Sequence, residues 1–381
     1  MGSSADAPDV PTGQVPPLFL PEPTGPYPVG TTSLWLTDGS RPDPWAPGAA
    51  ARELMVSLWY PAAKPGGRPA PYMTPAESEL QLVGRGITGI PLESLSTVQT
   101  NAVSDAAPAG QERSLPLVVL SPGYTGSRST LTALAEDLAS HGYVVIGIDH
   151  TYESLGTAFP DGRVTTCLSR EARRPGSGFS EKLAAGRAAD ASYVLSELTG
   201  THPAWPGAGL IDPTRMAMAG HSAGGAAAIA AMLADPRIRA GIDMDGSTVA
   251  EIPDRGLSRP FLFLGKASNY TPGIGGAVPP GTREWKLLRG AVSTWERDWE
   301  RMRGWKRWLV VAGAAHASFT DLGLLADRLG IDAGATRSGA RCLDITRAYV
   351  RAFFDQHLRG EPQVLLDQPS ARYREVTFCS P

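Results

Sequence analysis

The chain has 381 residues, of which 42% are hydrophobic and 19% charged, and its formal net charge is −3. This composition is typical of a globular protein with a sizeable core, and it provides no basic surface of the kind that binds nucleic acid. No apolar run reaches the length needed to span a bilayer. We therefore expect a folded globular protein that does not bind nucleic acid.

The first third of the chain predicts an extended arm followed by strands and an insertion. Residues 1–30 are rich in proline and are expected to be extended. Residues 31–38 and 52–62 carry β-forming residues between Pro and Gly, and they predict an opening antiparallel pair. The less regular stretch 63–114 predicts an insertion that could cap a site. It is expected to contain two short helices, at 74–87 and 91–103.

From residue 115 onward, strands and helices alternate. Apolar runs of strand length occur at 115–124, 143–150, 214–225, 238–246, 259–268 and 306–316. Segments with helical spacing of apolar residues occur at 127–142, 180–200 and 226–236. This alternation indicates an α/β fold with a mainly parallel sheet and helices on both faces. We expect one domain over 31–381, with insertions near 63–114 and 269–305.

A Gly-x-Ser-x-Gly motif lies where a predicted strand meets a predicted helix. It reads Gly220-His221-Ser222-Ala223-Gly224. In that context the serine occupies a sharp turn, and the glycines remove side chains that would collide. Ser222 is therefore the candidate nucleophile, and a simple tight turn is the alternative.

A nucleophilic serine needs a histidine base, and in this arrangement the chain order is serine, acid, histidine. Among the six histidines, His316 fits best because it follows a predicted strand and opens a loop. His150 also ends a strand, but it precedes Ser222. His221 is next to the serine and is expected to point away from it. We therefore predict His316 as the base.

The acid should end a strand between Ser222 and His316, and the segment "GIDMDG" offers Asp243 and Asp245. Both would lie on the same face of a strand, so alternation does not choose between them. Asp245 precedes Gly246, where a turn would present its carboxylate to the site. Asp243 would lie deeper, where a lone carboxylate is costly. We predict Asp245 and keep Asp243 as the alternative.

An oxyanion site needs two backbone N–H groups. One is expected from Ala223, which follows the nucleophile at the start of the helix. The other is expected from Tyr124, in the loop "SPGYTGS" after the strand at 115–124. No cysteine or histidine spacing resembles a metal site, so neither a metal nor an organic cofactor is expected.

Two segments near the predicted site carry secondary predictions. The loop 269–280 is expected to line the acyl or alcohol side of the substrate. Residues 293–308 predict an amphipathic helix, which packs on the core or serves as a lid or lipid-contacting surface. That helix carries Trp295, Trp299 and Trp305.

The remaining predictions concern pairing and location. Arg187 and Asp190 are three residues apart on a predicted helix and should form a salt bridge. A disulfide between Cys342 and Cys379 would hold the C-terminal tail in an oxidising compartment, with free thiols as the alternative. Met1 to Ser4 resemble an expression leader and no signal-peptide pattern follows, so we expect a secreted enzyme without its signal.

Seven segments together resemble the platelet-activating factor acetylhydrolase group of α/β-hydrolases over most of residues 23–360. They are "PTGPYPVGTTSLWL", "VSLWYPA", "LSPGYTGSRS", "GIDHTYES", "GHSAGG", "GIDMDG" and "GAAHASFTD". The resemblance implies a triad of Ser222, Asp245 and His316. It also implies oxyanion donors from Tyr124 and Ala223, and it therefore favours Asp245 over Asp243.

The segment "SPGYTG…LASHGYVVIGID" also resembles actinobacterial cutinases, which hydrolyse polyesters. That agreement weakens after Ser222, because this chain has "MDGST" where those enzymes carry a tryptophan. The extra length at 63–114 and 269–305 is also unlike an open groove for a polymer. Polyester hydrolysis is therefore an alternative to the main prediction.

The sequence as a whole predicts a serine esterase or lipase. It would act through an acyl-enzyme on a small-molecule or lipid ester of short to medium chain length, with at most interfacial contact with lipid. An acyltransferase, and an amidase or peptidase, would use the same three residues. A non-catalytic binding protein is the least favoured alternative, because Ser222, Asp245 and His316 are all present in the right order.

Overall fold

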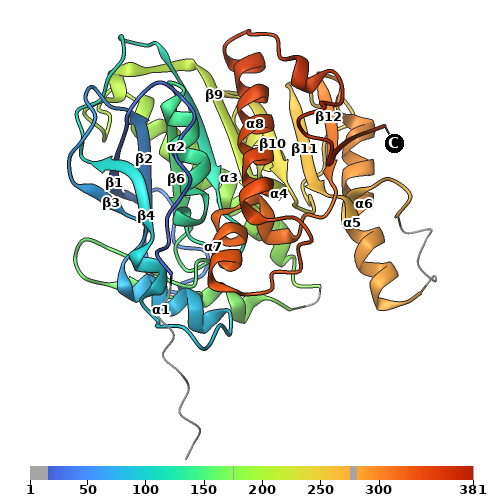
Figure 1. Ribbon diagram of the computed structural model, residues 1–381, viewed down its shortest axis with the longest axis horizontal. Coiled ribbons are helices and arrows are strands. Elements are labelled where there is room, and N and C mark those ends of the chain that lie inside the picture. The colour runs from blue at the N-terminus through green and yellow to red at the C-terminus, as the bar shows by residue number, and fades with distance from the viewer. Residues whose placement is uncertain (1–15, 175, 275–280, 381) are drawn as a thin grey trace, which may run out of the picture.

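The computed structural model describes residues 16–174, 176–274 and 281–380, apart from the side chains of residues 284, 285 and 287–289. Its centre is an eleven-stranded sheet with helices on both faces, as Figure 1 shows. The strand order across this sheet is β13-β12-β11-β10-β9-β5-β6-β2-β1-β4-β3. A separate two-stranded ribbon is formed by β7 and β8.

The elements of the described chain follow the predicted alternation from residue 115 onward. The strands are β1 (Val29–Asp38), β2 (Arg52–Pro61), β3 (Pro69–Pro71), β4 (Gln99–Ser104), β5 (Leu115–Ser121), β6 (Val144–Asp149), β7 (Thr157–Ala158), β8 (Val164–Thr165), β9 (Ile211–His221), β10 (Ile238–Met244), β11 (Phe261–Lys266), β12 (Lys306–Val311) and β13 (Val376–Cys379). The helices are α1 (Pro75–Gly84), α2 (Thr132–Ser140), α3 (Phe179–Thr199), α4 (Ala223–Ala234), α5 (Ala267–Tyr270), α6 (Arg283–Arg301), α7 (Asp321–Leu329) and α8 (Gly339–Leu358).

The middle of the sheet is parallel. Strands β6, β5, β9, β10, β11 and β12 pair in the same direction, and Val118 of β5 lies opposite Ala217 of β9. Every residue of β5 and β6 is buried, because helices cover both faces. The carboxyl ends of these strands therefore meet at one edge, where ligand sites of open α/β sheets form.

The N-terminal part of the sheet is mostly antiparallel, and it corrects one prediction. Strand β2 pairs antiparallel with β1 and with β6, as expected for an opening pair. The helix predicted at 91–103 is wrong: Ser94–Thr97 form a single 3-10 turn and Gln99–Ser104 form β4. The backbone of this segment instead pairs with β1, where Gly30 lies opposite Val103, and that partner overrides the local pattern.

The helices form two covering layers. In Figure 1, α2 and α8 lie on the near face of the sheet, and α3 and α4 pack against each other on the other face. The buried alanines of α4 let it approach α3 and the sheet closely. In α8, large buried residues such as Phe353 and Phe354 pack on the core.

The tryptophan-rich helix packs on the core, and it lies earlier in the chain than predicted. Helix α6 spans Arg283–Arg301, so Trp305 of the predicted helix lies outside it, and residues 306–311 form β12 within the strand predicted at 306–316. Trp295 is fully buried, with its ring centroid 4.6 Å from Phe263 and 5.3 Å from Trp308. Burial of such a large ring is worth several kcal/mol relative to exposure, on the order of 25 cal/mol per Å².

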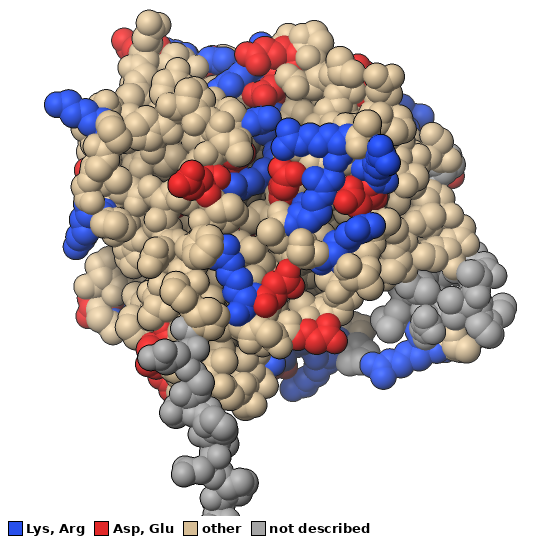
Figure 2. Space-filling model, viewed as in Figure 1, with Lys and Arg blue, Asp and Glu red and all other residues tan. Residues whose placement is uncertain are grey.

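On the face seen in Figure 2, basic and acidic side chains are interspersed, without one large patch of a single sign. Several of them pair across and along α8. Arg341, for example, binds Glu375 at 3.0 Å, and Arg359 binds Asp355 at 3.3 Å. The described part of the chain contains no helix that is both long and apolar enough to cross a membrane.

Candidate active site

Ser222 lies between the end of β9 and the start of α4, on a strained turn. Its φ is 55° and its ψ is −119°, a conformation that L-residues rarely adopt and that costs about 1–3 kcal/mol. The turn is held because the Ser222 amide donates to the Met244 carbonyl at 2.8 Å. A sharp turn of this kind exposes the serine Oγ at the end of the sheet.

The flanking glycines are required by close backbone packing. A Cβ atom on Gly220 would lie 2.2 Å from the backbone carbon of Gly224, and one on Gly224 would lie 2.0 Å from the carbonyl oxygen of Ser121. Real Cβ atoms do not approach other atoms so closely. The Gly-x-Ser-x-Gly pattern is thus explained by the packing of β9, α4 and β5 around the serine.

His316 follows β12 and begins a short 3-10 turn, His316–Phe319. Its Nε2 lies 3.0 Å from Ser222 Oγ, and its Nδ1 lies 2.5 Å from Asp245 Oδ2. The imidazole is half-exposed, whereas the Asp245 carboxylate is fully buried. The structure therefore brings the three predicted residues together in one hydrogen-bonded chain.

Asp243 and Asp245 have different partners. Asp245 has a φ of 58°, and its Oδ1 accepts a hydrogen bond from the Lys266 amide at 2.8 Å, which leaves Oδ2 for His316. Asp243 instead accepts from the Gly246 amide at 2.8 Å and from Trp295 Nε1 at 3.2 Å. Burial raises the pKa of Asp243 well above its ordinary value. Asp243 thus supports the turn and does not contact the histidine.

Both predicted oxyanion residues lie beside Ser222. Ala223 is the first residue of α4, and the first N–H groups of a helix have no partner within the helix. Tyr124 lies in the loop after β5 and lines the same cavity as Ser222 and His316. A Cβ on Gly123 would be 3.4 Å from the Ser222 Cβ, so this loop packs directly against the serine turn.

Two cavities open on Ser222. The larger, of about 450 Å³, has a mixed lining, with Phe179, Leu183 and Tyr270 beside polar residues such as Arg173 and Asn269. The smaller, of about 90 Å³, includes Arg85 and Leu322 in its lining.

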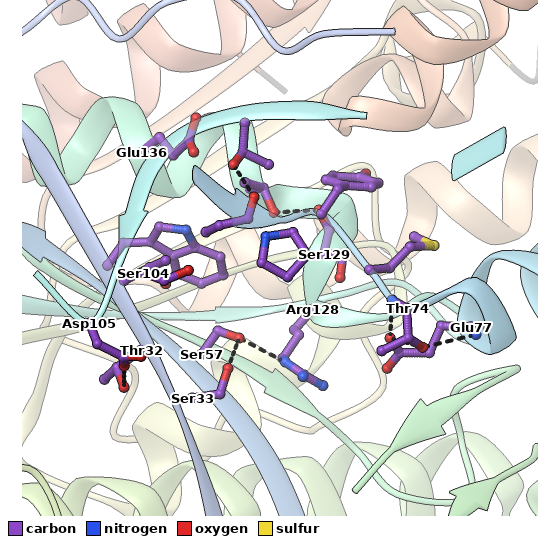
Figure 3. A pocket seen from close by; sticks show the side chains of 18 of the residues that line it. Thr32, Ser33, Ser57, Thr74, Glu77, Ser104, Asp105, Arg128, Ser129 and Glu136 are labelled. Atoms are coloured by element: carbon purple, nitrogen blue, oxygen red, sulfur yellow. Dashed lines mark hydrogen bonds between the residues drawn. The ribbon is translucent and has the colours of Figure 1, made fainter. Parts of the chain in front are cut away.

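A separate cavity of about 610 Å³ lies between the N-terminal strands and α2, and Figure 3 shows it. Hydroxyl groups line much of it. Ser33 and Ser57 are joined by a hydrogen bond of 3.2 Å, and Arg128 Nε donates to Ser57 Oγ at 2.8 Å. Ser222 and His316 are not among its lining residues, so this cavity is distinct from the candidate active site.

Comparisons with known proteins show which proteins this chain resembles. Residues 13–162 match the model of the family described as platelet-activating factor acetylhydrolase, isoform II. A probable 1-alkyl-2-acetylglycerophosphocholine esterase of Arthroderma benhamiae is 28% identical over 95% of this chain and 94% of its own length. A solved ferulic acid esterase from Streptomyces cinnamoneus is 40% identical, covers 96% of this chain and 100% of its own, and has a TM-score of 0.80.

The chain belongs to the platelet-activating factor acetylhydrolase-like esterases of the α/β-hydrolase fold. The predicted family and fold are confirmed, and the protein is a serine ester hydrolase. The cutinase resemblance is narrower: cutinase est2 of Thermobifida alba is 32% identical over only 33% of each chain. It supports the polyester alternative weakly.

Sequence reasoning missed the role of His221 in this esterase. His221 Nε2 donates to the backbone carbonyl of His316 at 2.8 Å, and the two rings lie 4.5 Å apart. Burial and the neighbouring His316 hold the pKa of His221 well below its ordinary value, so the ring is neutral. His221 therefore fixes the backbone that carries the candidate base. Its position next to the motif serine was the available signal.

A second set of buried polar groups lies behind the loop that carries Tyr124. His150 Nε2 lies 2.8 Å from Ser121 Oγ, and its Nδ1 lies 2.7 Å from Asp190 Oδ2. These three residues are 0–1% exposed, so this second Ser-His-Asp arrangement is closed to substrate. Burial is the largest effect on the His150 pKa and lowers it, so the ring is neutral. The arrangement anchors the end of β5.

The predicted salt bridge between Arg187 and Asp190 is wrong. Arg187 Nε binds Glu153 at 2.7 Å, and its Nη1 donates to the Pro122 carbonyl. Asp190 binds Arg52 at 2.8 Å. A spacing of three residues on a helix favours a salt bridge when both side chains are exposed. Here both side chains are fully buried, and they bind partners from distant segments of the chain.

The structure bears on two further predictions, the disulfide and the loop at 269–280. The thiols of Cys342 and Cys379 are free, so the disulfide is absent: Cys342 packs in the core and Cys379 lies on β13. The loop 269–280 contributes Asn269 and Tyr270 to the larger cavity, while residues 275–280 lie outside the described residues. Within the described chain, no group of three His, Cys, Asp or Glu side chains is arranged to hold a metal ion.

Proposed function

We propose that Ser222, His316 and Asp245 are the catalytic triad of this esterase and that hydrolysis proceeds through an acyl-serine. One observation carries the proposal. A continuous chain of hydrogen bonds runs from Ser222 Oγ to His316 Nε2 at 3.0 Å, and from His316 Nδ1 to Asp245 Oδ2 at 2.5 Å. Both distances are within the reach required of a nucleophile, its base and the group that orients the base.

In the first step, Ser222 Oγ attacks the carbonyl carbon of the ester while His316 Nε2 takes the hydroxyl proton. Asp245 holds the tautomer with the proton on Nδ1 and stabilises the imidazolium. The tetrahedral intermediate collapses, the bond to the alcohol oxygen breaks, and His316 gives the proton to the departing alcohol. Water then attacks the acyl-serine with His316 again as base, which releases the acid and restores Ser222.

The developing oxyanion is held by the backbone N–H groups of Tyr124 and Ala223. Ala223 is at the N-terminus of α4, where the helix dipole and free amides favour negative charge. Tyr124 is positioned by its ring, which packs edge-on against Phe179 at 5.4 Å, and by its hydroxyl, which lies 3.1 Å from Ser169 Oγ. Loss of one such donor typically lowers kcat by about 10²–10³-fold.

The substrate proposed is a carboxylic ester with one apolar or aromatic substituent of short to medium length. In the larger cavity, of about 450 Å³, the apolar and aromatic side chains of Phe179, Leu183 and Tyr270 form the part of the lining that would contact it. The relatives named as an acetylglycerophosphocholine esterase and a ferulic acid esterase support esters as the substrate class.

The test is hydrolysis of 4-nitrophenyl esters with acyl chains from two to ten carbons. Ser222→Ala is expected to lower kcat by about 10⁴–10⁶-fold on every ester. A matched control is Ser247→Ala, since Ser247 lines the same cavity but its hydroxyl faces Tyr270 at 3.2 Å and not His316. The proposal fails if Ser222→Ala turns over these esters as fast as the unmodified enzyme.

A further inference from the structure

The smaller cavity beside Ser222 carries one permanent charge. Its lining includes Ser222, His316, Thr130, Thr320 and Arg85. Arg85 directly follows α1, in the insertion that the sequence placed ahead of the main core. A guanidinium group therefore lies in the same small cavity as the nucleophile.

Arg85 is oriented by a neutral group. Its Nε and Nη2 donate to Gln81 Oε1, at 3.2 and 3.1 Å. The Gln81 side chain is completely buried, and its Nε2 donates to the Thr125 carbonyl at 3.4 Å, in the loop that also carries Tyr124. The amide thus holds the guanidinium in place without neutralising its charge. This is a preorganised cation, because its orientation is fixed before any ligand binds.

Arg85 is exposed, and it differs from the buried arginines of the described chain, which are either neutralised or saturated. Arg187 is paired with Glu153 at 2.7 Å. Arg347 has no carboxylate partner, but its guanidinium donates to three backbone carbonyls at 3.0–3.1 Å. Among the described residues, no carboxylate pairs with Arg85, and its Nη1 has no hydrogen-bond acceptor. Arg85 therefore retains the capacity to bind an anion.

Two neighbouring arginines add to the positive potential at this site. Desolvation by the surrounding protein lowers the pKa of the exposed Arg85, and the charge of Arg170 lowers it further, so these cations lie within range of each other. Arg173 lines the larger cavity, with its guanidinium carbon 5.7 Å from the centre of the Tyr124 ring. Like-charged groups gathered at a cleft attract ligands of the opposite charge.

We propose that the small cavity is a subsite for an anionic group of the ester substrate, a carboxylate or a phosphate, and that Arg85 recognises it. A guanidinium binds either group through two parallel hydrogen bonds, and either would supply the missing counter-charge. The preferred substrate then has an apolar substituent in the larger cavity and a short anionic one in the smaller. This inference rests on the proposed function, with Ser222 as the nucleophile.

The test compares charged and neutral esters of matched length. Mono-4-nitrophenyl adipate and 4-nitrophenyl hexanoate form the carboxylate pair, and 2-acetoxyethyl phosphate and 2-acetoxyethyl methyl ether form the phosphate pair. For each pair, the ratio of kcat/KM for the charged ester to that for the neutral ester is measured. We expect the enzyme to favour the charged member of at least one pair, and the pair shows which anion is recognised.

Arg85→Gln is expected to lower that ratio by roughly 10- to 100-fold, mainly through KM, as loss of a charge-assisted hydrogen bond does. Arg85→Lys keeps the positive charge but loses the two parallel N–H donors of the guanidinium. Its kcat/KM ratio should lie between those of the unmodified enzyme and Arg85→Gln. Gln81→Glu leaves Arg85 in place and supplies an internal counter-charge about 3 Å away, so it should lower the ratio as well. This variant tests the subsite even if Arg85→Gln does not fold.

Arg170→Gln distinguishes direct binding of the anion by Arg85 from long-range electrostatic attraction of the anion by nearby arginines. It is expected to change the ratio by less than about threefold, and that change should vanish at high salt, where exposed charges are screened. The subsite is overturned if the enzyme shows no preference for either charged ester, if Arg85→Gln and Gln81→Glu leave the ratio unchanged, or if Arg170→Gln equals Arg85→Gln. Failure of the enzyme on all four esters, charged and neutral, would instead overturn the proposed function.

Discussion

Asp243 and Asp245 lie two positions apart at the end of β10, and only Asp245 reaches His316, with Oδ2 2.5 Å from Nδ1. Asp245 turns toward the histidine because its backbone is left-handed, with a φ of 58°. Asp243 remains inside, where it accepts from the Gly246 amide and from Trp295. One carboxylate thus orients the candidate base, while the other holds the turn that makes this possible.

The first prediction follows from this division. Asp245→Asn should lower kcat for 4-nitrophenyl butyrate by about 10⁴-fold, because an amide favours the wrong tautomer of His316. Asp243→Asn should lower the free energy of unfolding by about 1–3 kcal/mol, since an amide cannot accept both hydrogen bonds, with a much smaller effect on kcat. Urea unfolding and steady-state kinetics measure the two effects. A larger loss of kcat in Asp243→Asn would identify Asp243 as the acid.

The second prediction concerns the serine turn. Gly224→Ala should lower the free energy of unfolding by about 1–3 kcal/mol, because the new Cβ would lie 2.0 Å from the Ser121 carbonyl oxygen and the backbone must shift. The matched control is Gly186→Ala in α3, where a Cβ meets nothing within 4 Å. That change should stabilise the protein by about 0.5–1 kcal/mol. Urea unfolding of Gly224→Ala that matches the unmodified protein would contradict the packing explanation.

The third prediction concerns the charges behind Tyr124. Arg187→Met should lower the free energy of unfolding by about 3–5 kcal/mol, because it leaves the buried Glu153 carboxylate without this partner. Adding Glu153→Gln should restore much of the stability, since the amide oxygen can still accept from Trp45.

Activity should not recover in that double variant. Arg187 also donates to the Pro122 carbonyl, two residues before Tyr124, and neither substitution replaces that donor. We therefore expect kcat to stay reduced in Arg187→Met with Glu153→Gln. If stability and kcat recover together, Arg187 affects activity only through folding.

The fourth prediction is a pH dependence of stability. His357 lies against Trp305 and Phe353, at ring distances of 4.4 and 4.8 Å, and burial lowers its pKa from 6.5 to about 4. Between these two values the unfolded state binds more protons than the folded state, so stability rises with pH across this window. The contribution of neutral His357 is complete above pH 6.5 and is lost as the pH falls toward 4.

His357→Leu should remove this dependence, because leucine fills the same apolar site without a proton to bind. On lowering the pH from 7 to 4.5, Tm of the unmodified enzyme should fall by about 2–4 °C more than Tm of the variant. Calorimetry at both pH values gives the comparison. Equal falls in Tm would show that His357 keeps its ordinary pKa.

Much of the site could be predicted from local sequence. The turn at Ser222 needs small residues at fixed neighbouring positions, and the order of serine, acid and histidine follows from the order of the strands. The alternation from residue 115 onward likewise predicted the parallel sheet, because buried strands and their covering helices carry distinct apolar patterns.

Other features depend on partners that are distant in the sequence. Gln99–Ser104 became β4 because β1 offers an edge to pair with, and local pattern alone suggested a helix. Arg187 binds Glu153, 34 residues away, because both side chains are buried where spacing along a helix has no influence. The position of Arg85 beside Ser222 is likewise a product of how α1 packs against the loop of Tyr124.

The sequence by itself determined the serine turn, the histidine and the fold class. Each of these depends on residues that are close together in the sequence, or on the order of the strands. The sequence favoured Asp245 over Asp243, but only the tertiary structure shows why Asp245 contacts His316. Strand alternation places both on one face, and the left-handed backbone at Asp245, held by hydrogen bonds to Leu264 and Lys266 of β11, directs one carboxylate to His316.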